Sequence, residues 1–411
     1  MVSMRALRYA AVVALLLVAS AADAQTVPAR GAGDTFDVGS WNLEHFGNDD
    51  SGFGPSDEAR QQANVAAVMR QAGVDLWALQ EIGDVDAFVG LLDALDDEGY
   101  EGVIGPSTGG SFDLRLAFVY DADLLTLDRV RTVPGVSSSN FGGRTPYEVV
   151  FTLTLGGAER EVHVIDVHAK AGTSMGDWST REDGAEDLKD YTDGLIADGA
   201  SVILLGDLND YLTGSITSGQ ASPYTPFVID EDDYAAATLD IDRRRRPTFC
   251  GGSYRDSGSC SSGGSTRDHL LFSADLLDAY VPEEDDRYLA LIPALDPYTT
   301  TTSDHLPVVA RFAFQSVAAA DGPEAGPVAL LPAAPSPFRD ATALRFRLEA
   351  PAAVRLEVFD VTGRRVASIA GPFGAGEHTV PLDGRALAPG AYVVRLAAEG
   401  VVQSRMIVRA D

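Results

Sequence analysis

The chain has 411 residues, of which 45% are hydrophobic and 22% are charged. This length is two to three times that of a typical domain, so it excludes a single small module and favours a large core with an accessory unit. The composition also excludes collagen, a coiled coil and bulk disorder, and no repeat with a period of about 20 to 50 residues recurs.

The charge balance is strongly acidic. The chain has 61 acidic and 31 basic residues, and its only lysines are Lys170 and Lys189. The segment from Gln25 to Pro332 alone holds 52 acidic and 19 basic residues, a net charge of −33. Such a surface disfavours tight, nonspecific binding to nucleic acids or anionic membranes. Because the Debye length falls to about 3 Å at 1 M salt, we interpret it as an adaptation to a saline habitat.

The segment 1–24 has the three parts of a secretory signal peptide. Arg5 and Arg8 precede an apolar run from Ala10 to Ala19, and Ala22 and Ala24 supply a small-residue cleavage site. We predict cleavage after Ala24. This apolar run is too short to cross roughly 30 Å of hydrocarbon, so we expect an exported monomer without stable membrane insertion.

Apolar periodicity predicts a core of strands and helices. A helix from about Ser56 to Ala72, closed by Gly73, lies between the first two strands. The predicted strands are Phe36 to Asn42, Val74 to Gln80, Arg115 to Tyr120, Tyr147 to Leu155, Glu161 to His168, Ser201 to Leu205, His269 to Phe272 and Val308 to Phe314. Many follow one another without a helix between them, so an α/β core of two sheets fits better than one parallel, doubly wound sheet.

The composition changes between Val317 and Pro337, where alanine, glycine and proline crowd together without periodicity. We therefore predict a core domain over residues 25–315, a linker over 316–332 and a C-terminal domain over 333–411. The C-terminal domain holds only short β-like runs separated by turn signals, which predicts a small β-sandwich.

The two cysteines, Cys250 and Cys260, lie in a stretch rich in glycine and serine. In an oxidising compartment this pattern predicts a disulfide that closes the loop, with two free thiols as the weaker alternative. A zinc site needs about four ligands, and no cluster of cysteine and histidine lies near them.

Polar residues that a structural strand does not need flank nearly every core strand. Alone, each such fragment is more typical of a solvated strand end than of a site. Six of them in one chain reverse that interpretation and favour a shared site. They are Trp41-Asn42-Leu43-Glu44, Gln80-Glu81, His168-Ala169-Lys170, Gly206-Asp207-Leu208-Asn209-Asp210, Asp268-His269 and Ser303-Asp304-His305-Leu306-Pro307.

These residue types suit the hydrolysis of a phosphate ester, with Mg²⁺ or Mn²⁺ held by hard oxygen ligands. Asp207 and Asn209 are two apart, so on an extended segment both point to one side, where the carboxylate can take a proton from water. His305 can donate to the phosphoryl group or accept the nucleophile's proton, and Asp268 can fix its tautomer. His168, if protonated, would neutralise developing negative charge.

From Thr35 to Phe314 the chain resembles the endonuclease/exonuclease/phosphatase superfamily. The spelling Trp41-Asn42-Leu43-Glu44-His45-Phe46-Gly47 is especially similar to that of its secreted deoxyribonucleases. The resemblance implies a four-layer α/β sandwich with two packed mixed sheets and a site at one edge of the sheets.

The same resemblance implies a metal site. Glu81 is the first expected ligand, with Asn42 beside it and Asp304 completing or sharing the shell. Glu44 either supports a second ion or is a surface carboxylate. Mg²⁺ or Mn²⁺ is the expected cofactor, and Ca²⁺ is also compatible with these ligands.

Two cationic features are candidate phosphate contacts. Arg144 resembles the phosphate-contacting arginine of the deoxyribonucleases, with an ordinary surface arginine as the alternative, and Lys170 is a second candidate. The run Arg243 to Arg246 either grips a polyanionic substrate or forms a solvated turn balanced by Asp240 and Asp242. The remaining core histidines, interpreted as packed or surface residues, are His45, His163 and His269.

The C-terminal segment 333–411 resembles the C-terminal sorting domain of the type IX secretion system. This resemblance implies an interaction with the type IX machinery, passage across an outer membrane, and removal of the tail or its exchange for a surface anchor. The alternative is an immunoglobulin-like accessory sandwich. The residues that carry the resemblance are Pro335-Ser336-Pro337-Phe338, Val358 to Arg364, Gly390-Ala391-Tyr392 and Arg405 to Val408.

Together these patterns predict a secreted or cell-surface, metal-dependent phosphodiesterase that cleaves DNA or RNA with an activated water. One alternative is a phospholipid hydrolase of the sphingomyelinase kind, or a small phosphoester hydrolase. A sphingomyelinase would need an exposed aromatic hairpin, whereas Trp41 and Trp77 lie in predicted strands and only Trp178 remains. The alternative from another class is a noncatalytic surface adhesin that has kept the fold.

Overall fold

The computed structural model describes residues 26–48, 52–109, 113–314, 328–334, 338–360, 365–388, 390–398 and 401–409. The predicted signal peptide, most of the predicted linker, and the parts 335–337 and 361–364 of the sorting-domain resemblance lie outside the described residues. The chain divides into two compact units, one ending at Ser316 and the other starting at Val317. No helix in the described ranges is long and apolar enough to cross a membrane.

The first unit contains two six-stranded sheets. In the first sheet β1 and β2 run parallel, and the other neighbours are antiparallel. Its strands, in spatial order, are β13 (Tyr280–Val281), β14 (Val308–Phe312), β1 (Phe36–Phe46), β2 (Leu76–Ile82), β4 (Arg115–Asp121) and β3 (Tyr100–Ile104).

The second sheet is also mixed. Its only parallel neighbours among the described strands are β7 and β8. Its strands, in spatial order, are β5 (Leu125–Thr132), β6 (Tyr147–Leu155), β7 (Ala158–His168), β8 (Ser201–Asp207), β12 (Asp268–Ser273) and β9 (Tyr234–Ala236).

The two sheets pack face to face through one apolar layer. Phe36 and Phe118 enter it from the first sheet, and Phe151, Ile203 and Leu270 enter it from the second. All five side chains are almost completely buried. Burial of apolar area on this scale is the main source of folding free energy, so this layer fixes how the two sheets face each other.

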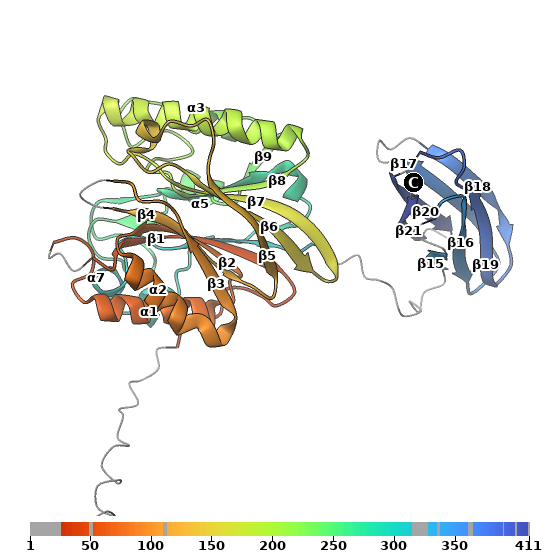
Figure 1. Cartoon of the computed structure of the whole chain (residues 1–411), viewed down its shortest axis with the longest axis horizontal. Coiled ribbons are helices and arrows are strands. Elements are labelled where there is room, and N and C mark those ends of the chain that lie inside the picture. Colours follow the sequence, from red (N-terminus) through yellow and green to blue (C-terminus); the bar gives the residue numbers. More distant parts are fainter. Residues whose placement is uncertain are drawn as a thin grey trace, which may run out of the picture. The chain divides into compact units, whose positions relative to one another are not determined.

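Helices cover the outer faces of both sheets. The first sheet is covered by α1 (Glu58–Ala72) and α2 (Val85–Leu95), and the second by α3 (Met175–Ala197) (Figure 1). Asp57 caps α1 by accepting the Arg60 N–H, and Gly73 ends it in a left-handed conformation. The predicted α/β architecture of two packed mixed sheets is therefore confirmed.

Short elements connect these layers. They are the 3₁₀ helices η1 (Asp96–Glu98), η2 (Ser138–Phe141) and η3 (Ala274–Leu276), the helices α4 (Thr225–Val228), α5 (Leu239–Arg243), α6 (Leu291–Ala294) and α7 (Tyr298–Thr301), and the strands β10 (Phe249–Cys250) and β11 (Gly264–Ser265). The predicted disulfide between Cys250 and Cys260 is present.

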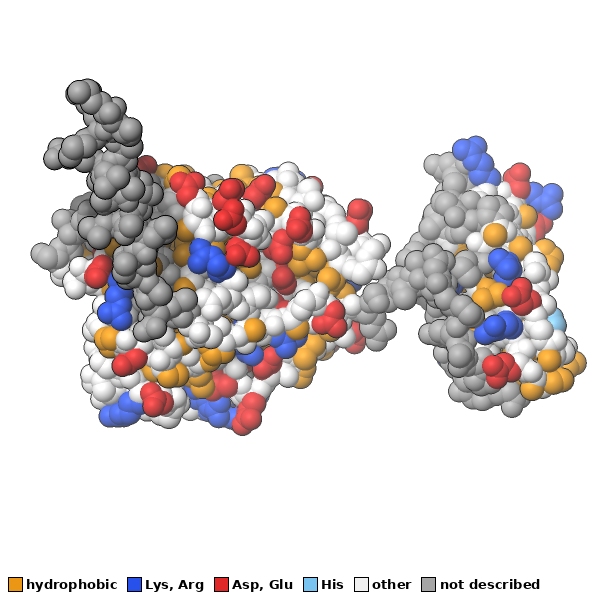
Figure 2. Space-filling view, turned by 90° about the horizontal axis from the view of Figure 1, so that it is seen from below, with side chains coloured by type: hydrophobic (Ala, Val, Ile, Leu, Met, Phe, Trp, Pro, Cys, Tyr) orange, Lys and Arg blue, Asp and Glu red, His pale blue; other side chains and the backbone are white. Residues whose placement is uncertain are grey.

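The first unit has more carboxylates than basic groups. Acidic side chains are spread over the face drawn in Figure 2, with arginines between them. Several arginines of the first unit form ion pairs, for example Arg30 with Glu283 at 2.7 Å and Arg160 with Asp275 at 3.1 Å. The acidic excess is thus distributed over the surface and partly paired.

The second unit consists of two small sheets that pack through one apolar cluster, which includes Phe346 and Leu396. The first sheet has the order β15 (Val328–Ala334), β16 (Ala341–Leu348), β19 (Gly376–Asp383). The second has the order β18 (Arg365–Phe373), β17 (Ala352–Asp360), β20 (Gly390–Ala398), β21 (Val401–Arg409). Residues 328–332, expected in the linker, belong to β15, because they pair with β16.

Candidate active site

The sheet ladders bring the predicted polar strand ends together. In the second sheet His168, at the end of β7, lies opposite Asp207 at the end of β8, and Asp207 lies opposite Asp268 on its other side. In the first sheet Asn42 pairs with Gln80, the residue before Glu81. Because paired residues are lateral neighbours in a sheet, these strand ends form one edge lined with polar groups.

A cavity of about 230 Å³ opens at this edge. Seven of the predicted site residues line it: Glu44, Glu81, His168, Asp207, Asn209, Asp304 and His305. Asn42 and Asp268 are fully buried and contact these lining residues. Side chains from the beginning and the end of the first unit's sequence therefore meet in one cavity.

The backbone around the cavity is unusual. Five non-glycine residues in the described ranges have a positive φ, and four of them line this cavity: Glu44 (48°), His45 (59°), Glu81 (63°) and Asn209 (50°). Such conformations are costly for residues with a Cβ, and they concentrate at functional sites.

Asp207 is fixed by three N–H donors. The Asn209 backbone N–H donates to Oδ1 at 2.9 Å, while Oδ2 accepts from Nδ2 of Asn42 at 3.1 Å and Nδ2 of Asn209 at 3.2 Å. The expectation that Asp207 and Asn209 share a side because the segment is extended was wrong, since Asn209 has a left-handed backbone. A tight turn places the two side chains together instead.

Glu81 is held on both oxygens. Its Oε1 accepts from Nδ2 of Asn42 and its Oε2 accepts from the backbone N–H of His45, both at 3.1 Å. The amide oxygen of Asn42 accepts from the Glu44 N–H at 3.0 Å, so the Asn42 nitrogen faces Glu81 and Asp207. In this arrangement Asn42 orients two carboxylates, and its role as a metal ligand stays a prediction.

Two further carboxylates crowd the same cavity. Burial and then the neighbouring Asp304 carboxylate raise the pKa of Glu44 to about 8. Burial raises the pKa of Asp304 to about 6, with Glu81 and Asp207 adding to the rise and His305 opposing it. Buried, mutually repelling carboxylates of this kind are stabilised by a positive charge between them.

The residues present fit a divalent cation. Ligand atoms of Glu81, His168 and Asp207 all lie within 4.8 Å of one another. Carboxylate oxygens are the ligands that Mg²⁺ and Mn²⁺ prefer.

His305 and Asp268 form the predicted pair. The Asp268 oxygens lie 2.8 and 3.0 Å from Nδ1 of His305, and the carboxylates of Asp207 and Asp304 lie 3.8 and 3.7 Å from Nε2. Although burial lowers the pKa of His305, these three carboxylates together raise it to about 10. His305 is therefore the cationic imidazole of the cavity.

His168 differs from His305. Burial, followed by the guanidinium of Arg144, holds the pKa of His168 well below its usual range. Its Nε2 lies 3.6 Å from Glu81 and 3.7 Å from Asp207, and its Nδ1 has no hydrogen-bond partner among the described residues. The condition attached to the predicted role of His168, protonation, is disfavoured in this arrangement, and the role itself stays a prediction.

The two predicted phosphate contacts lie outside the cavity wall. Arg144 donates to the backbone carbonyls of His168 and Ala169 at 3.2 and 2.9 Å, so it supports the end of β7. Lys170 donates to the Ala171 carbonyl and lies 3.2 Å from Asp177. Neither side chain lines the cavity, and their role as phosphate contacts stays a prediction.

The cavity also contains residues that sequence reasoning missed. His45 and Phe53 lie with ring centroids 5.2 Å apart on one part of the wall, and Phe249 and Arg267 form another. The one available signal was the position of Arg267 directly before Asp268. Aromatic residues in loops carry no periodicity that would have revealed the others.

The basic run Arg243 to Arg246 is a paired turn. Arg244 bonds Asp240, Arg245 bonds Asp242 and Arg246 bonds Asp285, at 2.8, 3.1 and 2.6 Å. The solvated-turn interpretation is thus favoured over a substrate grip.

Two histidines have structural partners. His163 is buried against Glu148, as its interpretation as a packed residue predicted. His269 is buried between Thr238 and the carbonyl of Asp210. Neither lines the cavity.

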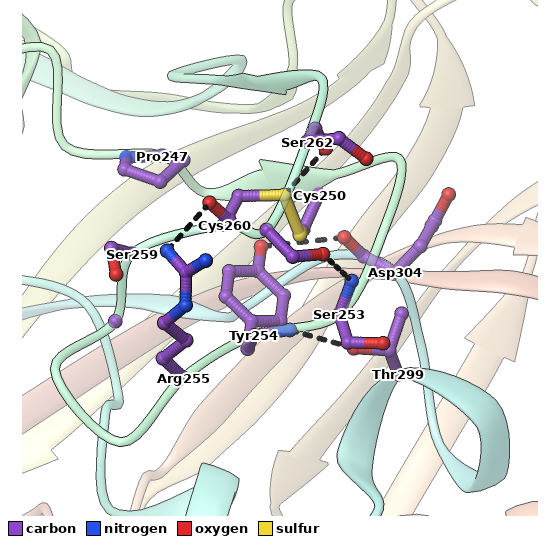
Figure 3. Close-up of a disulfide and its surroundings, with 12 residues drawn as sticks. Pro247, Cys250, Ser253, Tyr254, Arg255, Ser259, Cys260, Ser262, Thr299 and Asp304 are labelled. Atoms are coloured by element: carbon purple, nitrogen blue, oxygen red, sulfur yellow. Dashed lines mark hydrogen bonds between the residues drawn. A yellow bond between two sulfur atoms is a disulfide. The ribbon is translucent and has the colours of Figure 1, made fainter.

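The disulfide loop supports the segment that carries Asp304 and His305. The Cys250 N–H donates to the Asp304 carbonyl at 2.8 Å, and the Tyr254 hydroxyl lies 3.3 Å from the same oxygen (Figure 3). The Leu306 N–H donates to the Thr248 carbonyl at 2.7 Å. The loop therefore fixes the cavity wall through backbone contacts.

Residues 39–305, more than half of the chain, match the family model described as the Endonuclease/Exonuclease/phosphatase family. The chain belongs to this family, which confirms the resemblance drawn from its motifs, and it is a metal-dependent phosphoric ester hydrolase. A comparison with curated proteins found no significant match.

Several solved structures are similar at low sequence identity. An endonuclease/exonuclease/phosphatase from Beutenbergia cavernae is 17% identical, with 91% of this chain and 100% of that chain covered and a TM-score of 0.47. A variant of the 3′ phosphatase NExo from Neisseria, bound to a product DNA hairpin, is 18% identical, with coverages of 68% and 100% and a TM-score of 0.48. An AP endonuclease from Archaeoglobus fulgidus is 15% identical, with coverages of 68% and 100% and a TM-score of 0.46.

Proposed function

We propose that the chain is a secreted phosphodiesterase that hydrolyses DNA or RNA with a divalent metal ion. The observation that carries this proposal is the convergence of Glu81, Asp207, Asp304 and His305 on one cavity. Carboxylates for a cation, a positioned carboxylate base and a cationic imidazole are the groups that in-line attack of water on a phosphodiester requires.

Glu81 and Asp304, with Asn42 and Glu44 close by, would hold Mg²⁺ or Mn²⁺. When bound, the cation supplies positive charge that stabilises the phosphoryl oxygens. Asp207, fixed by its three N–H donors, takes the proton of the attacking water. His305, oriented by Asp268, donates to the phosphoryl oxygens or to the leaving oxygen.

The walls of the cavity favour nucleic acid among the possible phosphoesters. Phe53, which is 42% exposed, presents ring surface beside the polar groups. Bases of single-stranded nucleic acids stack on such rings without requiring a particular sequence.

The test compares supercoiled plasmid, single-stranded RNA, sphingomyelin liposomes and a sugar phosphate, each with Mg²⁺, Mn²⁺, Ca²⁺ or EDTA. We expect nicking of the plasmid or cleavage of the RNA with Mg²⁺ or Mn²⁺, and loss of that activity in EDTA. His305→Ala and Asp207→Ala should each lower turnover by at least a hundredfold. Cleavage of liposomes alone would transfer the assignment to the phospholipid hydrolases, and no turnover of any substrate would favour the adhesin.

The proposal includes export and surface delivery. The signal-peptide pattern in the segment 1–24 and the sorting-domain resemblance of the tail support it. Mass spectrometry of the protein released by its natural host tests both. We expect a mass that lacks the segment up to Ala24 and the C-terminal unit, whereas an accessory sandwich would remain attached.

A further inference from the structure

Arg267 is a fixed part of the cavity wall. Its guanidinium lies over the ring of Phe249, 3.7 Å from the centroid. Its Nε donates to Oγ of Ser265 at 2.8 Å and its Nη1 donates to Oδ1 of Asn209 at 3.3 Å. One face and one edge of the guanidinium are thus held in place, and Arg267 is the only lysine or arginine among the described residues that line the cavity.

The partners of Arg267 are all uncharged. Arg245 lies over Tyr211 at 4.1 Å in a similar way, but Asp242 neutralises it. Arg181 and Arg287 likewise bond carboxylates. Among the described residues Arg267 forms no ion pair, although it belongs to a strongly acidic segment. A preorganised guanidinium without a carboxylate partner is suited to an incoming phosphate.

In space, one residue separates Arg267 from each of the proposed reacting groups, His305 and Asp207. The Phe249 ring contacts both the Arg267 guanidinium and the His305 imidazole, whose centroid lies 5.1 Å away. On the other side Asn209 bonds both Arg267 and Asp207. Phe249 and Asn209 therefore separate the guanidinium from His305 and Asp207 while keeping it in the same cavity.

We propose that Arg267 binds a phosphate adjacent to the one that is cleaved, so that the site selects chains of phosphodiesters over single phosphoesters. This inference rests on the proposed nucleic-acid function. Phe249 acts as the support that keeps the guanidinium in place, and it is itself fixed by the neighbouring Cys250 disulfide.

The test is the steady-state kinetics of Arg267→Gln on two substrates, a labelled oligothymidylate of eight nucleotides and bis(p-nitrophenyl) phosphate. We expect KM for the oligonucleotide to rise about tenfold and the slope of log(kcat/KM) against log[salt] to become shallower by about 0.7. Turnover of bis(p-nitrophenyl) phosphate, which has one phosphate, should stay within twofold. That substrate also reports whether the variant is folded.

The matched control is Arg245→Gln, which removes a stacked arginine that is already paired. It should leave KM and turnover unchanged for both substrates. Arg267→Lys keeps the charge and should recover part of the affinity for the oligonucleotide. If Arg267→Gln is not folded, Arg267→Lys takes its place in the test. We then expect its KM for the oligonucleotide to be higher than that of the wild type, while its turnover of bis(p-nitrophenyl) phosphate stays unchanged.

Two results would overturn the Arg267 inference without contradicting the proposed nucleic-acid function. The first is equal behaviour of Arg267→Gln and Arg245→Gln on the oligonucleotide. The second is an equal loss of kcat on both substrates, which would make Arg267 a positioning residue for Asn209. If the wild-type enzyme hydrolyses bis(p-nitrophenyl) phosphate but no oligonucleotide, the nucleic-acid function itself fails, and the Arg267 inference fails with it.

Discussion

Single residues in the cavity have distinct electrostatic roles. The two buried histidines His168 and His305 lie 3.7 and 3.8 Å from Asp207, yet the pKa of His305 is raised and that of His168 is lowered. The difference comes from their neighbours. Asp268 contacts the ring of His305, whereas Arg144 lies near His168. Burial lowers the pKa of both imidazoles; the carboxylates of Asp268, Asp304 and Asp207 outweigh it at His305, whereas the guanidinium of Arg144 adds to it at His168.

Asp268→Asn tests this dependence. The substitution keeps the size of the side chain but removes the negative charge beside Nδ1 of His305 and alters the tautomer that it favours. We expect kcat on an oligonucleotide to fall by roughly 10²- to 10⁴-fold with little change in KM, as for other histidines that lose an orienting carboxylate.

The control for this substitution is Asp240→Asn, which alters an exposed pair with Arg244. It should leave kcat unchanged. A wild-type kcat in Asp268→Asn would show that the pair does not assist the reaction.

At the residue scale the sequence predicted the ionisable groups better than their surroundings. Glu81, Asp207 and His305 could be found because each interrupts or ends a strand pattern. Arg267 and Phe249 could not, because stacking of a guanidinium on a ring depends on how two loops meet and leaves no periodic signal. The neighbours of Lys170 could not be predicted either, since its contact with Asp177 forms only once the loop is folded.

At the scale of elements, Glu148 of β6 joins three neighbours. It bonds Arg131 of β5, His163 of β7 and Tyr191 of α3. Burial raises the pKa of Glu148, but these hydrogen bonds outweigh burial and lower it from its ordinary value of 4.5 to about 2. Because the pKa is lower in the folded state, Glu148 stabilises the protein above pH 4.5 and loses this effect as the pH falls through 2.

Glu148→Gln should therefore lower the free energy of unfolding by about 3 kcal/mol at pH 7 and by only about 1 kcal/mol at pH 3. Urea unfolding of the variant and the wild type at both pH values measures this difference. An equal loss at both pH values would mean that the effect is one of packing and not of charge.

The disulfide loop is the second element whose energetics can be tested. Cys250 and Cys260 are 10 residues apart, and closing a loop of this length lowers the entropy of the unfolded chain, which raises the free energy of the unfolded state by about 2 to 3 kcal/mol. We expect the double variant Cys250→Ser/Cys260→Ser to lose about this much stability in urea unfolding. A reductant should destabilise the wild type by the same amount and leave the variant unaffected. The same response in both proteins would show that this stability does not come from the disulfide.

Elements were predictable from the sequence where the pattern was long. The eight predicted strands all exist, with ends that differ by a few residues, because alternating or fully apolar runs identify buried strands. The short strands β9 and β13 were not predicted, since two or three residues show no period, and the edge strands β3 and β5 and the helix α2 were not predicted either. The longest helix, α3, was not predicted. It is rich in acidic residues and has only a few buried positions, so its apolar pattern is weak.

At the scale of the whole molecule, the acidic surface and the cavity impose opposite requirements. The carboxylates on the face of the first unit drawn in Figure 2 would repel a polyanion, while the proposed binding of nucleic acid depends on a small number of short-range contacts. Added salt screens the repulsion and also weakens each phosphate contact. With the single contact assigned to Arg267, kcat/KM on an oligonucleotide should fall only about fivefold between about 0.1 and 1 M NaCl. A loss of a thousandfold or more would contradict adaptation to salt.

The cavity and the C-terminal domain belong to different units of the chain. The cavity is lined by residues between Glu44 and His305, all of which belong to the first unit. Each unit also has its own apolar core. A protein ending at Ser316 should therefore keep the kcat, KM and unfolding midpoint of the longer chain on the same oligonucleotide. If the shortened protein is folded by circular dichroism but its kcat is at least tenfold lower, the C-terminal unit takes part in catalysis and is more than a delivery or accessory domain.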